Sequence, residues 1–330
     1  MADEIAACTA ALWSTVKKSR VCTLTGYEPV VYEELFFKYT WPHYRGQFRV
    51  TAAKAARRQF AALAWIKMAP KKEQMMHVLG MDYQTFCRNV HPFLRYLANN
   101  MDEVHWDDRL HPMNHCDIWP YYVTHIKDTY CVPVADSSLA GYSSLLYSTK
   151  YHTTGLKAEV TCDFRGHIVD FKFPAGTANA SDFTIHNQRV VDGEIVLNPW
   201  ELGMGDGVYR GCTQLLAKHP ENFNYAYDRA TRYRSIVVPL TDEQGLLNAM
   251  VSNPRQRIEH IVGQVSYHAL YRTKYRGAYE PLCDAVHITM HLTNMKIRMC
   301  SVNATDANGR SRYADVCGPW RHDLPDVHAV

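Results

Sequence analysis

The chain has 330 residues and a mass of 37.9 kDa, and at ~150 residues per domain this length corresponds to about two domains. Hydrophobic residues make up 47% and charged residues 21% of the chain, a balance that excludes a disordered, collagen-like or coiled-coil protein. No apolar run approaches the ~20 residues needed to cross a bilayer, so no membrane partner is expected. The net charge of +3 is too small to indicate a polyanionic ligand, and the distribution of charge carries more information.

The cysteines do not form a recognisable disulfide or zinc framework. Ten of them are dispersed along the chain without C-x-x-C spacing, and a chain of this length can bury a core without disulfides, so reduced thiols are expected. His111, His115 and Cys116 lack a second pair of ligands, and the His287/His291 pair lacks the glutamate of a zinc-protease motif. We therefore expect these groups to be loop or packing residues.

The first ~110 residues have the apolar spacing of helices. The expected helices are Val30 to Tyr39, the Ala-rich Ala52 to Met68, Lys71 to Leu79, and Tyr83 to Met101. Gly80 suits a left-handed C-cap and Asp82 an N-cap, while Pro92 predicts a kink or break in the last helix. A short helix, a Gly-containing turn and a longer helix are typical of a helix-turn-helix.

A run of positive charge lies in the same region. From Arg45 to Lys72 the chain has eight basic residues and no acidic residue. Such a run is usually a solvated helix face, but its length and single sign also suit contact with a phosphate backbone. Residues 106–120 show little periodicity and are expected to form a connecting loop.

From residue 129 the pattern changes to short β runs. The expected strands are Thr129 to Ala135, Lys157 to Phe164, His167 to Phe173, Glu201 to Gly205 and Ser235 to Leu240. The expected helices are Ala180 to Gln188, a short segment near Cys212 to Lys218, Gln244 to Tyr271 with an interruption at Asn253-Pro254, and Pro281 to Met299. Asp163 to Gly166 has hairpin-turn chemistry. This order predicts an α/β fold with a ribonuclease-H-like mixed sheet flanked by helices.

Three carboxylates lie where that sheet would bring them together. Asp136 closes the first expected strand, Asp206 follows the fourth, and Glu259 lies on the long helix. Clustered anions repel each other unless divalent cations hold them, and Mg²⁺ prefers carboxylate oxygens. Two such ions can stabilise the attacking and leaving oxygens of a phosphoryl transfer. The alternative is three separate roles: an N-cap, a turn residue and a surface partner of Arg255.

The surroundings of these acids resemble the DDE transposases of the PIF/Harbinger class and their domesticated relatives. The resemblance covers roughly Leu24 to Met299. The similar pieces, in family order, are Leu24-Thr25-Gly26, Val78-Leu79-Gly80 with Thr85, Val134-Ala135-Asp136, Lys150, Gly155-Leu156-Lys157, a hairpin over Val160 to Val169, Pro174-Ala175-Gly176 with Asp182, Gly205 to Tyr209, and Asn248, Arg255 and Glu259. Departures are Ser137-Ser138-Leu139, a longer connection from Asn187 to Glu201, and Ser266.

The resemblance implies a DNA endonuclease or transposase that cuts element ends and joins them to target DNA. Asp136, Asp206 and Glu259 would be the catalytic ligands of two Mg²⁺ or Mn²⁺ ions. The expected partners are double-stranded DNA and a separate Myb-like protein, and the expected location is the nucleus. Because related reactions pair two DNA ends, we also expect a homodimer on DNA.

The resemblance also sets the expected domain boundaries and DNA contacts. A helix-turn-helix-like DNA-binding region would cover residues 1–110, a linker 111–128, the ribonuclease-H-like catalytic domain 129–300 and a tail 301–330. The expected DNA-binding residues are Arg57, Arg58, Lys71, Lys72, Arg88, Lys150, Lys157 and Arg255. Two alternatives remain open at this point: a domesticated copy that binds DNA without cutting it, and a structural protein with no nucleic-acid role.

Overall fold

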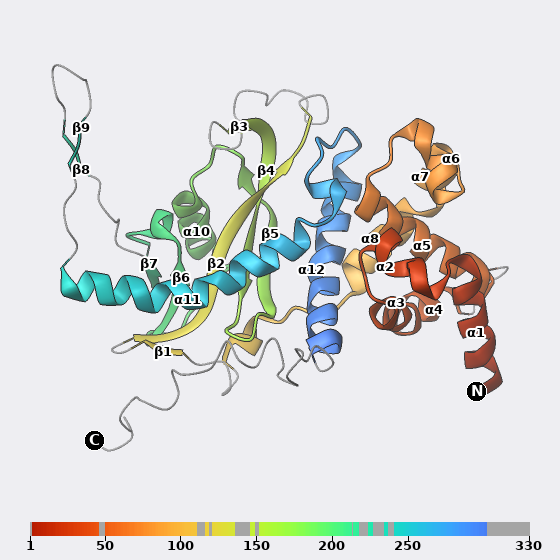
Figure 1. Ribbon diagram of the computed structural model, residues 1–330, viewed down its shortest axis with the longest axis horizontal. Coiled ribbons are helices and arrows are strands. Elements are labelled where there is room, and N and C mark those ends of the chain that lie inside the picture. The colour runs from red at the N-terminus through yellow and green to blue at the C-terminus, as the bar shows by residue number, and fades with distance from the viewer. Residues whose placement is uncertain are drawn as a thin grey trace.

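The computed structural model describes residues 2–45, 50–110, 116–118, 121–135, 146–148, 152–212, 214–217, 224–226, 234–236 and 241–301. It is a mixed α/β protein in which a group of helices precedes a curled mixed sheet that is flanked by helices (Figure 1). The expected α/β class is confirmed at this level.

The N-terminal part consists of short helices around the longer α5. Its helical segments are α1 (Ala2–Thr15), η1 (Lys18–Arg20), α2 (Val21–Thr25), α3 (Pro29–Leu35), the π-helix η2 (Phe36–Thr40), α4 (Trp41–Tyr44), α5 (Ala52–Met68), η3 (Lys72–Gln74), α6 (Met75–Leu79), α7 (Tyr83–Asn89), α8 (His91–Asn100) and η4 (Trp106–Leu110). The expected caps are confirmed, since Gly80 ends α6 with a φ of 67° and Asp82 accepts a hydrogen bond from the Thr85 N–H at 2.9 Å. The expected break is also present, with Pro92 in the first turn of α8.

The sheet is built from antiparallel and parallel pairs. Its strands are β1 (Cys116–Ile118), β2 (Tyr121–Pro133), β3 (Tyr147–Ser148), β4 (Thr153–Cys162), β5 (Ile168–Thr177), β6 (Glu201–Gly205) and β7 (Leu215–Ala217). The strand order across the sheet is β5-β4-β2-β6-β7. The pairs β5/β4 and β4/β2 are antiparallel, and the pairs β2/β6 and β6/β7 are parallel. β1 pairs with the start of β2 and β3 with the start of β4. A separate hairpin joins β8 (Asn224–Ala226) and β9 (Arg234–Ile236).

Three helices flank this sheet. They are α10 (Asp182–Val191), α11 (Asp242–Val265) and α12 (Tyr279–Ser301), with the short segments η7 (Gly207–Tyr209) and η8 (Ala269–Tyr271) between them. α11 contacts β2, β4 and β6 and runs across the sheet in Figure 1. α12 lies between the sheet and the N-terminal helices, because it contacts β5 on one side and α8 on the other (Figure 1).

Several expected elements differ in the structure. β2 begins eight residues before the expected strand, so residues 121–128 are strand rather than linker. Residues near Cys212 to Lys218 form the strand β7 instead of a helix. α11 continues through Asn253-Pro254 without interruption, so the expected break there is wrong. Tertiary pairing with β6 and packing on the sheet outweigh the local signals at these positions.

One large hydrophobic core joins the helical part to the sheet, and a smaller cluster surrounds Tyr209. At this junction the Glu103 N–H donates to His291 Nδ1 at 3.0 Å, and Asn294 Nδ2 donates to the Glu103 carbonyl oxygen at 2.6 Å. Burial lowers the pKa of His291 to about 4, so the ring is a neutral acceptor near pH 7. His291 is therefore a packing residue, as expected. No helix in the described part of the chain is long and apolar enough to cross a membrane.

The Gly26 turn provides a second contact between the two parts. Gly26 has a φ of +84°, and a Cβ atom there would lie 2.6 Å from Cε1 of His268, whose ring stacks on Tyr27. The turn after α2 therefore requires glycine for both its backbone conformation and the space it leaves to the imidazole.

We predict that Gly26→Ala lowers the free energy of unfolding by about 2–4 kcal/mol, since it adds overpacking to left-handed backbone strain. Gly166→Ala is the matched control, because Gly166 has a φ of +88° and nothing within 4 Å of its Cβ position. The control should cost about 1 kcal/mol in urea unfolding. Equal costs at the two positions would contradict a steric role for His268.

Candidate active site

Two parallel strands bring two aspartates side by side. The last pair in the parallel register of β2 and β6 is Ile126 with Met204. Two residues further along, the same register sets Asp128 opposite Asp206, which directly follows β6. Because side chains alternate along a strand, Asp128 points to the same face of the sheet as Ile126. The structure thus joins Asp206 with Asp128.

The carboxyl group of Asp128 is held in an unfavourable environment. Burial raises the pKa of Asp128 to about 6, and the negative charges of Asp206 and Asp182 act in the same direction. The Thr129 N–H donates to Asp128 Oδ1 at 2.7 Å, and the positive charge of Arg255 also opposes the rise. These favourable interactions do not outweigh burial and charge repulsion.

Asp182, in the first turn of α10, adds a third negative charge that acts on Asp128 from the other face of the sheet. It is almost fully buried, and its Oδ1 accepts a hydrogen bond from Lys157 Nζ at 2.5 Å. The same ammonium group donates to the Ala180 carbonyl oxygen at 2.6 Å. Lys157 therefore serves as the internal counter-ion of Asp182.

The helix α11 carries Arg255 and the exposed Glu259. The Arg255 guanidinium pairs with the Glu259 carboxylate one helical turn away. The positive charge of Arg255 also acts on Asp128. Ile258 and Ile261 are buried against the core and hold this stretch of α11 in place.

A tight turn after β6 fixes the position of Asp206. Its Oδ1 accepts a hydrogen bond from the Val208 N–H at 2.8 Å, and its carbonyl oxygen accepts from the Tyr209 N–H at 3.1 Å. The Tyr209 ring packs against Gly205, where a Cβ atom would lie 2.5 Å from the ring. The Tyr209 hydroxyl is buried, and no described residue hydrogen-bonds it.

The opposite face of β2 carries charges that are paired. Lys127 donates to Glu159 Oε2 at 3.2 Å, and Arg189 of α10 donates to the same oxygen at 2.5 Å. Arg189 also makes two hydrogen bonds to Asp170. This buried network joins β2, β4, β5 and α10. Its cations and carboxylates are in direct contact, whereas no cation contacts Asp128 directly among the described residues.

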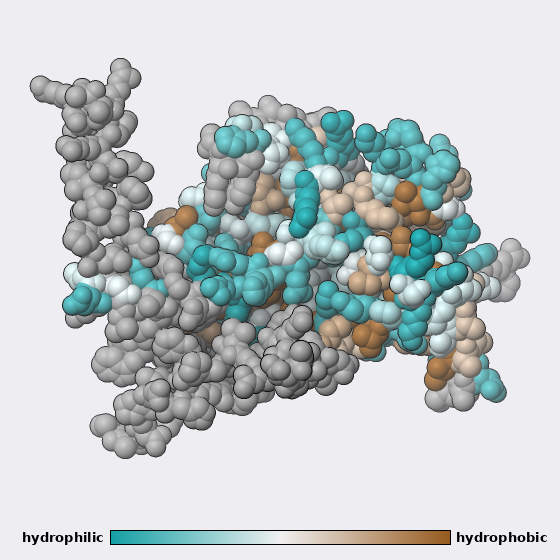
Figure 2. All heavy atoms as spheres, in the orientation of Figure 1, coloured by the Kyte–Doolittle hydropathy of each residue, from teal (hydrophilic) through white to brown (hydrophobic). Residues whose placement is uncertain are grey.

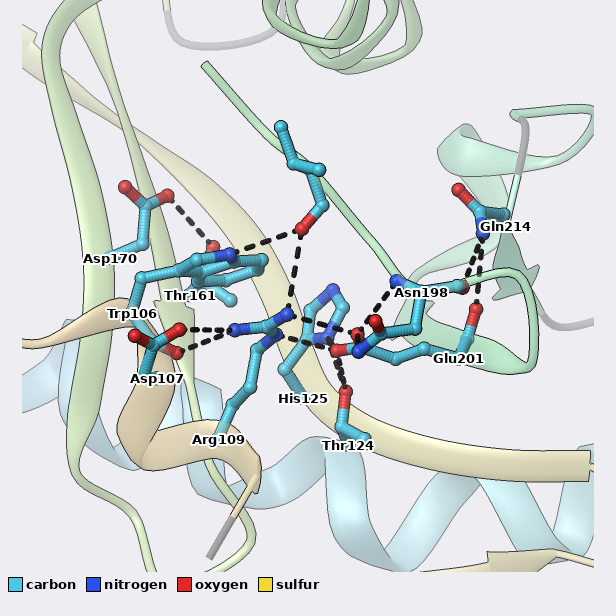
Figure 3. A network of polar contacts seen from close by, with 11 residues as sticks. Trp106, Asp107, Arg109, Thr124, His125, Thr161, Asp170, Asn198, Glu201 and Gln214 are labelled. Carbon is cyan, nitrogen blue, oxygen red and sulfur yellow. Dashed lines mark hydrogen bonds and ion pairs between the residues drawn. The ribbon is translucent and has the colours of Figure 1, made fainter. Parts of the chain in front are cut away.

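A second buried network anchors the start of β6 (Figure 3). Arg109 donates from Nε to Glu201 Oε1 at 2.5 Å and from Nη2 to Oε2 at 3.0 Å. Thr124 of β2 and Asn198 donate to the same carboxylate. Burial pushes the pKa of Glu201 upward, but these hydrogen bonds outweigh it and the pKa is lowered. The network therefore fixes the start of β6, at the other end of the strand from Asp206.

Of the three expected metal ligands, the structure describes two. Asp206 lies at the end of β6 as expected, and Glu259 lies on α11 with Arg255 as its partner. Asp136 lies outside the described residues. Within the described ranges, no group of three or more His, Cys, Asp or Glu side chains has the arrangement of a metal site. The full triad thus stays a prediction.

Sequence reasoning missed Asp128 because the expected strand began one residue after it. A signal was available, since an aspartate between Ile126 and Tyr130 is unusual in a mostly buried strand. The expected Asp136 lies further along the chain, beyond the end of β2 at Pro133. At ~3.3 Å per residue, the five residues from Asp128 to Pro133 already span about 16 Å. Ala135, the last described residue before Asp136, pairs with Tyr275.

The expected DNA-binding residues also divide into groups. Lys71, Lys72 and Arg88 are exposed, and hydrophilic residues cover the surface over α6 and α7 in Figure 2. Arg57 is exposed but donates to the Gly80 carbonyl oxygen, and Arg58 donates to Asn89 Oδ1.

The remaining three expected DNA contacts come from the part of the chain that contains the sheet. Lys157 and Arg255 are engaged in the ion pairs described above, and Lys157 is buried, so its environment does not support a DNA contact. Lys150 lies outside the described residues.

Comparisons with family models, curated proteins and solved structures found no match to this chain. The geometry of the site and the spacing of its motifs are therefore the grounds for a functional assignment.

We predict that Asp128→Asn stabilises the metal-free protein by about 3 kcal/mol near pH 7.5. The pKa of Asp128 is about 6 in the folded protein and 3.8 in the unfolded chain. Ionisation of Asp128 therefore opposes folding fully above about pH 6 and not at all below about pH 4. The gain should therefore vanish as the pH falls through this window. Urea unfolding in EDTA measures it, with the exposed Asp192→Asn as control; a pH-independent gain would contradict the prediction.

We predict that Arg109→Met lowers the free energy of unfolding by about 3–5 kcal/mol, because it leaves the buried Glu201 carboxylate without its cation. The double variant Arg109→Met/Glu201→Leu should recover much of this loss, since it removes the uncompensated charge as well. Chemical denaturation of both variants is the measurement. A double variant that is less stable than the single one would show that the pair itself stabilises the fold.

Proposed function

We propose that the protein is a metal-dependent DNA endonuclease of the DDE transposase type, with Asp128 and Asp206 as the strand carboxylates and Glu259 as the helical one. The observation that supports this most is the parallel register of β2 and β6, which, continued two residues past its last pair, sets Asp128 in the middle of β2 beside Asp206 at the end of β6. Ligand sites of α/β sheets form at the carboxyl ends of strands. The charge of Arg255 on α11 acts on Asp128, and Glu259 pairs with Arg255.

The strand arrangement is compatible with this proposal. An antiparallel β5-β4-β2 unit continued by parallel β6 and β7 is the order expected for a ribonuclease-H-like sheet. The turn and helix boundaries at Gly80 and Asp82 likewise support a helix-turn-helix in the N-terminal part. Fold alone does not assign activity, so the acids carry the argument.

The donor set suits Mg²⁺ or Mn²⁺, because it consists of carboxylate oxygens. The raised pKa of Asp128 shows that its ionised form lacks sufficient positive charge nearby, a deficit that a divalent cation would remove. Asp128, Asp206 and Glu259 would hold two such ions. When bound, the ions would polarise the scissile phosphate and favour deprotonation of the attacking water or hydroxyl.

The other residues of the site have supporting roles in this proposal. Arg255 orients the Glu259 carboxylate and supplies positive charge for a phosphate oxygen. Lys157 pairs with the Asp182 carboxylate and fixes it at the start of α10. The exposed Lys71, Lys72 and Arg88 would contact the DNA backbone. A Myb-like partner, a homodimer on DNA and a nuclear location follow from the resemblance alone and belong to the proposal.

A domesticated, inactive DNA-binding protein is the second candidate. It is favoured by the absence, among the described residues, of a complete metal-binding arrangement. The two candidates differ in one property, since only the endonuclease must cleave.

We predict that Asp206→Ala and Asp128→Ala each reduce Mn²⁺-dependent nicking of supercoiled plasmid by ~100-fold or more while DNA binding persists. The exposed Asp192→Ala is the control and should nick like the parent. Asp136→Ala is the decisive comparison, because it tests the sequence-based choice of the first carboxylate. It should retain activity.

Two results would contradict this proposal. If Asp206→Ala nicked as fast as the parent, the carboxylate mechanism would be wrong. If Asp136→Ala abolished nicking and Asp128→Ala did not, the first ligand would be Asp136. A parent that binds DNA with a steep salt dependence but never nicks it would favour the inactive candidate.

A further inference from the structure

Exposed apolar side chains border the carboxylates on the side of α10 and η7. Phe183 directly follows Asp182 and is 36% exposed, while Val208 lies two residues after Asp206 and is 45% exposed. Phe183 and Val208 each leave more than a third of their surface in solvent. This surface is therefore available to a ligand that also meets the carboxylates.

Phe183 is held in a defined position. Its helix begins at Ser181, whose Oγ accepts a hydrogen bond from the Thr184 N–H at 3.0 Å. The Phe183 ring reaches the turn after β6, where its Cε2 atom lies 3.7 Å from the Cβ position of Gly211. The aromatic ring thus lies across the contact between α10 and the segment that carries Asp206.

Val208 is fixed to Asp206 by the turn itself. Its N–H donates to Asp206 Oδ1 at 2.8 Å, so its side chain keeps a constant position relative to that carboxylate. The preceding Gly207 is exposed and adds no side chain. Phe183 and Val208 together form what we call the apolar ledge.

We propose that the apolar ledge binds the nucleobase next to the scissile phosphate, with Phe183 stacking on it, so that the protein acts on a strand whose base at the cut is unstacked. This inference rests on the proposed function, which places the phosphate at the carboxylates. A base attached to that phosphate lies within reach of side chains adjacent to the acids. An aromatic ring stacks on any base, and a base inside a duplex offers no free face to it.

A single exposed apolar residue is common on protein surfaces and by itself means little. Val191 at the other end of α10 is an example, since it is 80% exposed. It provides the matched control, because it is an apolar residue of the same helix that lies nine residues from Asp182.

The test is a double-mutant cycle between protein and DNA. The cut position is first mapped with the parent and Mn²⁺ on a forked oligonucleotide. Single-turnover cleavage is then compared for the parent and Phe183→Ala, each on the intact strand and on a strand with an abasic site beside the cut. We expect Phe183→Ala and the abasic site each to slow cleavage by ~5- to 150-fold, and their combination to add no further loss. Val191→Ala should cleave like the parent.

Additive losses, or a parental rate for Phe183→Ala, would overturn the inference. These results are distinguishable from failure of the proposed function, because that failure appears as Asp206→Ala cleaving like the parent. If the parent does not cleave, the same cycle is run on oligonucleotide affinity in Ca²⁺, with an abasic site moved along the strand. The inference would then be wrong if, at every position, the abasic site weakened binding by the same factor in the parent and in Phe183→Ala.

Discussion

The parallel pairing of β2 with β6 is the constraint on which the site depends. It sets Asp128 beside Asp206, and two like charges near one another in a partly buried position destabilise the metal-free fold. A parallel pair also needs a long connection, here through β4, β5 and α10. Pairing is maintained from the other end of β6, where Arg109 and Thr124 hold the buried Glu201 carboxylate.

The two faces of the sheet differ in how their buried charges are paired. On the α10 face, Lys127, Glu159 and Arg189 form a closed network in which each ion has a counter-ion. On the α11 face, the nearby Arg255 is shared with Glu259, and the pKa of Asp128 remains raised. The first network stabilises the fold, whereas the second leaves negative charge to be neutralised by something that binds. This difference supports the proposed site at Asp128 and Asp206.

Local signals predicted the helical part well. The Ala-rich α5, the Gly80 cap and the Asp82 cap depend on neighbouring residues, and all three were predictable. The start of β2 was not, because a strand that carries an acid and a lysine in its middle is stabilised by pairing and by ion pairs with residues far along the chain. The β7 strand and the unbroken α11 depend on tertiary contacts in the same way. Motif order named Asp206 and Glu259, which lie after β6 and on α11, and Asp136, which lies outside the described residues. It did not name Asp128 in the middle of β2.

The most direct measurement of the central claim is an anomalous-scattering map from crystals grown with Mn²⁺. The account predicts a peak within coordination distance of carboxylate oxygens from both Asp128 and Asp206. A peak held by other residues, with no density between these two side chains, would contradict it.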